Sequence, residues 1–209
     1  MTDTMVALRA PEVRTMSALG LQLRDVQADG RFLLGRAVPY NTWTSIGWFA
    51  EQFSPGAFAR SIKEAANGLP LLMWHNNQTW PVGVSDKWDD NAQGLDGVWK
   101  LDTSEEAERA ADLAEKKMLT GLSVGFVPIR SQWEMVDWKD WDPDLGVEHM
   151  DKVTRDEARL LEVSLTPTPA YAGAQVSLVR SREAKKVRDG GRESAELLGW
   201  RRYLESVKR

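Results

Sequence analysis

Few side chains in this sequence could carry out chemistry. It contains two histidines, His75 and His149, and no cysteine, so a histidine-dependent reaction must use one of these two and no thiolate nucleophile exists. His75 follows the apolar run 71–74 and precedes two asparagines, where a side chain can leave a strand and face a cleft. A single histidine at a strand end is more commonly a hydrogen-bonded structural residue. His75 therefore needs a partner nucleophile to be a candidate general base.

Ser123 is the candidate nucleophile. It lies in Gly-Leu-Ser-Val-Gly-Phe, residues 121–126, where the two glycines would leave room for a substrate backbone and for an amide that holds an oxyanion. A small residue in a glycine-containing strand is the plainer interpretation. The nucleophile elbow of α/β-hydrolases does not fit, because it needs a helix after the serine and an acid and a histidine later. Here a strand-like run follows, and the only later histidine, His149, lies in a charged segment.

Glu162 is a carboxylate among apolar neighbours in the segment 158–165. Strand alternation places it on the face of Leu160 and Ser164, so it either points to solvent or orients the imidazole of His75. In the second case it would be the acid of a serine-hydrolase triad and would stay ionised beside an imidazolium. Such chemistry needs neither a metal nor a cofactor, and none is predicted.

The composition is that of one soluble globular domain. The chain has 209 residues, of which 42% are hydrophobic and 28% charged, which argues against a disordered or fibrous protein. Without cysteine, disulfides and zinc-thiolate sites are excluded. No apolar run reaches the roughly 20 residues of a membrane span, and no signal-peptide pattern begins the chain, so we expect no membrane association and an intracellular location.

Most segments around the candidate residues alternate apolar and polar side chains, as strands do. Two segments instead predict helices, 57–66 after a Ser-Pro pair and 107–118 after a capping box that begins at Thr103. The polar, Trp- and Asp-rich segment 137–156 is predicted to be a loop. The predicted strands are 19–26, 32–38, 69–74, 81–88, 95–101, 122–129, 132–136, 159–165 and 175–179.

The order of these elements predicts an α+β fold. The first two strands form a hairpin around Asp29-Gly30, and strands outnumber helices without the strict alternation of a doubly wound sheet. We therefore expect a β-barrel or curled sheet flanked by helices.

The two ends of the chain differ from this predicted domain. Residues 1–17 are expected to be a flexible segment, and 18–180 to be the domain itself. The tail, 181–209, holds nine basic and five acidic residues, a net charge of +4, whereas the rest of the chain carries −8. After a Gly-Gly pair, the tail predicts an amphipathic helix that buries one face against a partner. The residues of its apolar stripe are Leu197, Trp200, Leu204 and Val207.

Five segments taken together resemble the phage prohead protease family of the HK97 type, which is related to the herpesvirus assembly proteases. The strength of the resemblance is the ordered series of His75, Ser123 and Glu162 within strand contexts, over roughly residues 19–179. The Trp-rich insert at 133–141 matches no feature of the family. The segments that carry the resemblance are 35–41, 53–58, 72–76, 121–126 and 161–170.

The resemblance implies a serine endopeptidase with a herpesvirus-protease-like barrel ringed by helices. It implies Ser123 as nucleophile, His75 as general base and Glu162 as third member. Because herpesvirus relatives use a second histidine as third member, His149 stays an alternative. The enzyme would be enclosed in the immature head in the host cytoplasm, where it cleaves scaffold protein or the scaffolding part of the major capsid protein, and often itself. Scaffold or capsid protein would also be the partner of the tail.

Other functions are weighed against this one. A catalytically inactive assembly or scaffold module could keep a protease-like fold and bind capsid protein, because fold alone does not guarantee activity. Such a module would not require all three candidate residues, which favours the enzyme. Nucleic-acid binding is prompted by the basic tail, but the acidic body and the lack of a recognised binding motif argue against it. The resemblance suggests a homo-oligomer, with dimers as one form.

Overall fold

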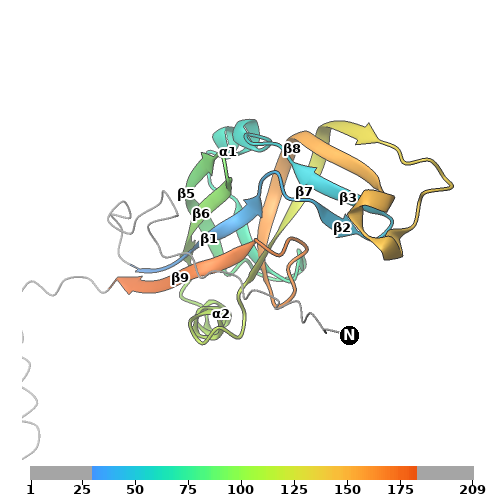
Figure 1. Ribbon diagram of the computed structural model, residues 1–209. Helices are drawn as coiled ribbons and strands as arrows, with labels where there is room; N and C mark the ends of the chain where they lie inside the picture. Colours follow the sequence, from blue (N-terminus) through green and yellow to red (C-terminus); the bar gives the residue numbers. More distant parts are fainter. Residues whose placement is uncertain (1–29, 183–209) are drawn as a thin grey trace, which may run out of the picture.

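The computed structural model describes residues 30–182, which form one mixed sheet with two short helices on its outside (Figure 1). A mostly-sheet fold with few helices confirms the coarse prediction. No helix in this range is long and apolar enough to cross a membrane. The elements are β1 (Gly30–Pro39), β2 (Thr44–Ile46), β3 (Phe49–Phe53), α1 (Ala59–Glu64), β4 (Pro70–Met73), β5 (Gly83–Asn91), β6 (Gly94–Leu101), α2 (Glu105–Glu115), β7 (Gly121–Glu134), the 3-10 helices η3 (Pro143–Leu145) and η4 (Val147–His149), β8 (Asp151–Thr166) and β9 (Gln175–Arg182).

The sheet curls so that its last strand returns to an earlier one. Its strand order is β2-β3-β8-β4-β5-β6-β1-β9-β7, and β7 also pairs with β8. The β7–β9 link is the shortest, one ladder pair between Gly121 and Gln175. Nearby, β1 approaches β9 so closely that a Cβ at Gly35 would lie 2.6 Å from the carbonyl oxygen of Gln175. The predicted barrel thus corresponds to a curled sheet that depends on close backbone approach at this edge.

Strand β8 is the centre of this arrangement. Its first part pairs in parallel with β3 and its last part in parallel with β4, while β7 pairs antiparallel along most of its length. Both β7 and β8 are much longer than β3 and β4, which pair with different parts of β8. As a result, residues near the ends of β4, β7 and β8 meet although they are far apart in sequence.

Aromatic and aliphatic side chains fill the inside of the curl. Phe53 contacts Phe58, Phe126 and Tyr171 with ring centroids 5.0 to 5.6 Å apart, and Trp99 is fully buried. Helix α2 packs against the core through alanines, and their small side chains let the helix approach the core closely. These alanines are Ala107, Ala110, Ala111 and Ala114.

The structure differs from the predicted elements at several places. Residues 151–156, predicted as part of a loop, begin β8, and β7 continues through the predicted break at 130–131 by means of bulges. These stretches were missed because most of their side chains are exposed or half-buried, so apolar alternation is weak. The short strands β2 and β3 were also missed.

The predicted helix starts are displaced as well. The N-cap of α2 is Ser104, whose hydroxyl accepts a hydrogen bond from the amide of Ala107, and not Thr103. The predicted opening hairpin is wrong. Its second strand corresponds to β1, and β1 pairs with β6 on one side and β9 on the other. Its first strand, 19–26, lies outside the described residues, as do segment 1–17 and the tail from residue 183.

A buried ionic network ties the edge of the sheet to β8. Arg155 donates to Glu51 from Nε at 2.6 Å and to the Ser131 hydroxyl at 3.0 Å, and the Tyr171 hydroxyl donates to the other Glu51 oxygen. Burial and the Glu51 carboxylate raise the pKa of Tyr171 above its ordinary value, so its hydroxyl stays protonated and remains a donor. The network joins β3, β7, β8 and the loop before β9.

Replacing Glu51 by glutamine should destabilise the domain strongly. Glu51 and Arg155 are both nearly buried, so the substitution leaves a guanidinium in the interior without a counter-charge. The free energy of unfolding should fall by about 3 kcal/mol. Urea denaturation followed by tryptophan fluorescence measures this. The control is Glu64→Gln, which breaks the exposed pair with Arg60 and should leave the midpoint unchanged; equal effects of the two variants would contradict a structural role for the buried network.

Candidate active site

His75 enters the site through an unusual turn at the end of β4. Trp74 and His75 have φ angles of +53° and +56°, a left-handed conformation that is uncommon for residues other than glycine. The turn is held to β8, because the Trp74 amide donates to the Leu165 carbonyl at 3.0 Å and the His75 amide donates to the Ser164 hydroxyl at 2.9 Å. These bonds offset the backbone strain and direct the imidazole toward β8.

The imidazole of His75 is paired with Glu162, which is the second of the two positions considered for this carboxylate from the sequence. His75 Nδ1 lies 2.6 Å from Glu162 Oε1, and the Ser164 hydroxyl donates to Glu162 Oε2 at 2.7 Å. The Glu162 side chain is 13% exposed and that of His75 is 44% exposed. When Nδ1 carries the proton of this hydrogen bond, Nε2 is the ring nitrogen left to accept a proton.

Ser123 lies beside this pair on the adjacent strand. In the β7–β8 ladder it is directly opposite Ser164, which places the two Cβ atoms about 4.5–5.5 Å apart on one face of the sheet. Ser123 is 6% exposed, and among the described side chains its hydroxyl has no hydrogen-bond partner, His75 included. Catalytic hydrogen bonds often tighten only when substrate is bound. The structure therefore brings His75 and Glu162 into contact. It places Ser123 opposite Ser164, whose hydroxyl is hydrogen-bonded to both of them.

The glycines around Ser123 have a different role from the predicted one. The space above Gly125 is filled by the Glu162 carboxylate, and a Cβ there would overlap it. At Gly121 a Cβ would lie 2.5 Å from the Thr166 carbonyl oxygen and 2.6 Å from Pro169 Cδ. The interpretation that both glycines leave room for a substrate is thus wrong, since protein atoms occupy that room. Gly125 instead lets the glutamate fold over β7 toward His75.

Ser164 is the site residue that sequence reasoning missed. It is fully buried, and its one hydroxyl accepts from the His75 amide and donates to Glu162. The available signal was its position two residues after Glu162, on the same face of a strand. Serine is common at such positions, so the alternation alone did not single it out.

His149 lies apart from this network. It ends η4, and its Nδ1 is 3.1 Å from the carbonyl oxygen of Asp140 within the Trp-rich segment. No group of three or more His, Asp or Glu side chains within residues 30–182 could hold a metal ion.

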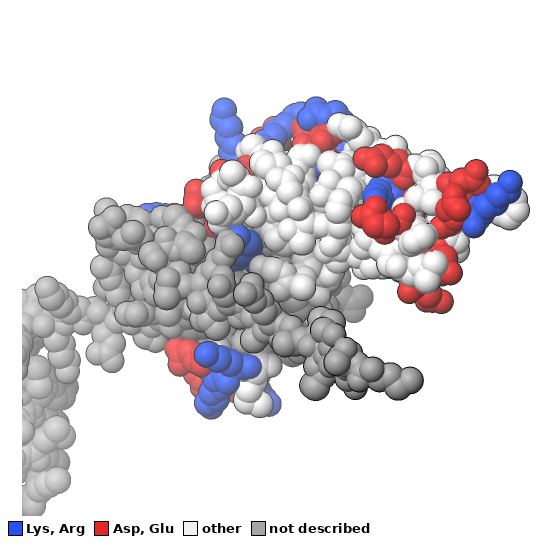
Figure 2. Space-filling model, viewed as in Figure 1, with Lys and Arg blue, Asp and Glu red and all other residues white. Residues whose placement is uncertain are grey.

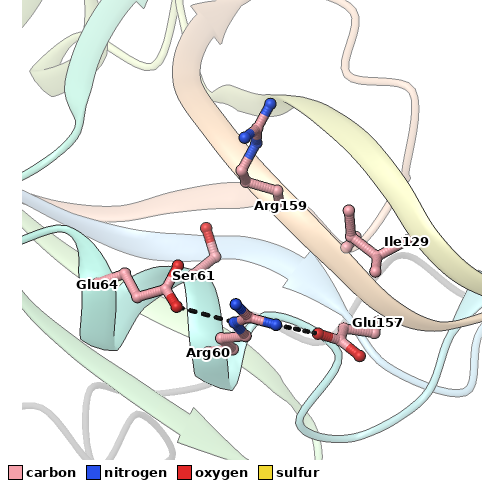
Figure 3. Close-up of a pocket in the computed structure, with 7 residues that line it drawn as sticks. Arg60, Ser61, Glu64, Ile129, Glu157 and Arg159 are labelled. Atoms are coloured by element: carbon pink, nitrogen blue, oxygen red, sulfur yellow. Dashed lines mark hydrogen bonds and ion pairs between the residues drawn. The ribbon is translucent and has the colours of Figure 1, made fainter.

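A small hollow beside α1 is also separate from the candidate residues (Figure 3). It has a volume of about 150 Å³ and includes Arg60, Ser61 and Arg159 in its lining. Several of its polar groups are already paired: Arg60 forms ion pairs with Glu64 and Glu157, and the Ser61 hydroxyl forms hydrogen bonds with the backbone of Leu160. Figure 3 shows Arg159 pointing away from this ion-paired cluster. The hollow therefore offers no convergent reactive groups.

A family model described as "Caudovirus prohead serine protease" matches residues 20–189, most of the chain. The chain belongs to this family. Membership of this family makes the chain, in general terms, a protease of phage capsid maturation. No curated protein matches it.

Among solved structures, this chain is similar to two structures of a herpesvirus enzyme. One is KSHV protease in complex with a hexapeptide phosphonate inhibitor, with 12% identity, coverage of 85% of this chain and 77% of the other, and a TM-score of 0.39. The other is Kaposi's sarcoma-associated herpesvirus protease with an allosteric inhibitor, with 14% identity, coverage of 85% and 91%, and a TM-score of 0.40. At these values the likeness says nothing about individual residues.

Gly125→Ala should displace the Glu162 carboxylate and loosen His75. We expect a loss of turnover of about 10- to 100-fold with little change in KM, because orientation and not binding is affected. Nitrogen-15 NMR of the imidazoles should show loss of the Nδ1 hydrogen bond of His75, an assignment made simple by the presence of only two histidines. Combining Gly125→Ala with Glu162→Asp, whose shorter side chain avoids the clash, should cost no more than Glu162→Asp alone. Additive losses would contradict this steric account.

Ser164→Ala should lower kcat about tenfold and leave KM unchanged, because it removes the hydroxyl that holds both the His75 amide and Glu162. Ser164→Thr keeps the hydroxyl and should restore much of the loss. Thermal unfolding of both variants separates this effect from a fold defect. If the alanine variant keeps wild-type kcat, or if threonine is no better than alanine, Ser164 only fills space.

Proposed function

We propose that this protein is a serine endopeptidase in which Ser123, His75 and Glu162 carry out the reaction. The observation that supports this is the pair between His75, in the turn after β4, and Glu162 on β8, with Ser123 on β7 at the register position of Ser164. An acid on one imidazole nitrogen and a hydroxyl close to the ring is the arrangement of serine-hydrolase triads. Family membership supplies the reaction class, and the geometry supplies the residues for the proposal.

In the proposed mechanism His75 Nε2 takes the proton of the Ser123 hydroxyl as Oγ attacks the carbonyl carbon of a peptide bond. The imidazolium gives that proton to the leaving amine as the C–N bond breaks, which leaves an acyl-enzyme on Ser123. Water then loses a proton to His75 and attacks the ester carbonyl. The C–O bond to Ser123 breaks, the imidazolium returns the proton to Ser123 Oγ, and the new carboxyl end is released. Glu162 holds the ring through Nδ1 and stabilises its charged form.

The structure favours Glu162 over His149 as third member in this proposal. Glu162 already contacts His75, whereas the ring of His149 is engaged by the Asp140 carbonyl in another part of the chain. A second histidine is therefore not required to orient the base.

The proposed substrates are scaffold protein and the scaffolding part of the major capsid protein, inside the immature head within the host cell. We also propose that the chain cleaves itself. Membership of the prohead family supports this setting, and the partly exposed His75 ring is consistent with a protein substrate reaching the site from solvent.

A second candidate function is an assembly module that binds capsid protein without cutting it. The observation in its favour is that the Ser123 hydroxyl has no hydrogen bond to His75 among the described residues. A fluorophosphonate probe distinguishes the two, since it labels only a serine that an adjacent base activates. Labelling that disappears in Ser123→Ala would exclude the inactive module.

Substitution of the proposed triad should abolish processing in a graded manner. Ser123→Ala and His75→Ala should each lower turnover by on the order of 10⁴-fold or more, and Glu162→Gln by about 10²- to 10⁴-fold, because glutamine keeps the shape but removes the charge. His149→Ala should be nearly silent. Mass spectrometry of each chain co-expressed with the capsid protein of its own phage reads out cleavage sites and self-cleavage together.

Circular dichroism of the purified variants serves as the control that the domain still folds. Unchanged processing by Ser123→Ala would end the serine-protease proposal. A crippled His149→Ala together with a normal Glu162→Gln would transfer the third position to the histidine.

A further inference from the structure

An exposed aromatic surface lies at the end of the molecule formed by β2, β3 and the segment between β7 and β8. Among its residues Trp138 is 80% exposed, Met135 71% and Trp48 57%, although such side chains are usually covered. They surround a hollow of about 290 Å³. We name this surface the Trp patch and define it by Trp48, Trp133, Met135, Trp138 and Trp141.

The Trp patch is supported by defined contacts. The rings of Trp48 and Trp133 stack, with their centroids 6.2 Å apart and their planes at 10° to each other. The Arg155 guanidinium lies 5.7 Å from the centroid of the Trp133 ring. Asp151 and Val136 both line the hollow, and the Asp151 carboxylate accepts a hydrogen bond from the Val136 amide at 3.0 Å. The aromatic side chains are thus presented by long strands and fixed turns. A contiguous exposed apolar surface of this kind is typical of an interaction site.

Acidic side chains surround the Trp patch. Residues 134–151 contain seven Asp or Glu and a single Lys, which gives this stretch a net charge of −6. Figure 2 shows red side chains gathered at the end of the molecule where these residues lie, around white surface. A partner that fits must present aromatic or aliphatic groups between positive charges.

We propose that the Trp patch binds the tail of a second copy of this chain, residues 183–209. That segment holds eight basic and five acidic residues, a net charge of +3, and carries Leu197, Trp200, Leu204 and Val207 at three- and four-residue steps. Its charge is opposite to that of the patch, and its apolar side chains match the aromatic surface. Scaffold or capsid protein, the partner expected from the sequence, is the competing one.

The position of the patch favours a second copy over the same chain. In Figure 1 β9, after which the tail begins, ends on the left, whereas β2 and β3 beside the patch lie on the right. A neighbouring copy can present its tail to the patch without that tail running along the whole molecule. Because the two surfaces differ, the contact is head-to-tail and can join several copies in succession.

The test uses the full chain with Ser123→Ala, so that the tail stays attached if the chain cleaves itself; the intact mass verifies this. Copies grown in nitrogen-14 and nitrogen-15 are mixed and treated with a carbodiimide, which joins lysine amines directly to carboxylates. We expect mixed-isotope crosslinks from Lys185, Lys186 or Lys208 to acidic residues within 134–151. Crosslinks only within one isotope, or to the acidic helix α2 in place of the patch, would overturn the proposal.

Two sets of variants sharpen the result. Trp138→Gln with Trp141→Gln should lower these crosslinks at least about tenfold, as should Trp200→Gln with Leu204→Gln in the tail, which leaves the domain unchanged. Trp80→Gln is the matched control, because Trp80 is 89% exposed but lies outside the patch, and crosslinks should stay at the parent level. An equal loss of crosslinks in the Trp80→Gln control, or no loss in the tail variant, would refute the proposed contact between the tail and the Trp patch. Crosslinking does not depend on catalysis, so the outcome is independent of the triad proposal.

Discussion

The pairing of β8 with β4 on one side and β7 on the other is the constraint on which the site depends. The parallel β4 ladder aligns Leu72 with Ser164, and the antiparallel β7 ladder aligns Ser123 with the same residue. Ser164 is therefore the common point between the strand that delivers the histidine and the strand that delivers the serine. A shift of either ladder by one residue would turn the candidate side chains to the other face of the sheet.

Strain and close packing complete what the ladders begin. The left-handed turn at Trp74 and His75 ends β4, and it is stabilised because both amides are bonded to β8. On the other side, Gly125 leaves the space that the Glu162 carboxylate occupies. The orientation of the imidazole thus depends on two backbone features as well as on its ionic partner.

The sequence predicted those parts of the site that stand out against their surroundings. Glu162 was identified because a carboxylate among apolar neighbours of a strand needs a reason. His75 was identified because it is one of two histidines and lies at the end of an apolar strand, and the contact between the two is present. Ser164 was missed because serine is unremarkable on a strand, and the turn at Trp74 was missed because local propensity opposes it and only tertiary bonds stabilise it. The glycines were misinterpreted, since a sequence shows that space exists and not what fills it. The full lengths of β7 and β8 were hidden because exposed strands lack apolar alternation.

The wide sequence separations within the site have a consequence for biosynthesis. The bond from His75 to Ser164 spans 89 positions and that from His75 to Glu162 spans 87, so the arrangement cannot exist until β8 has been synthesised and has inserted between β4 and β7. Such long-range pairing forms late in folding, because loop closure precedes any gain from contacts. A nascent or partly folded chain therefore lacks the aligned imidazole, which is present only in the finished sheet.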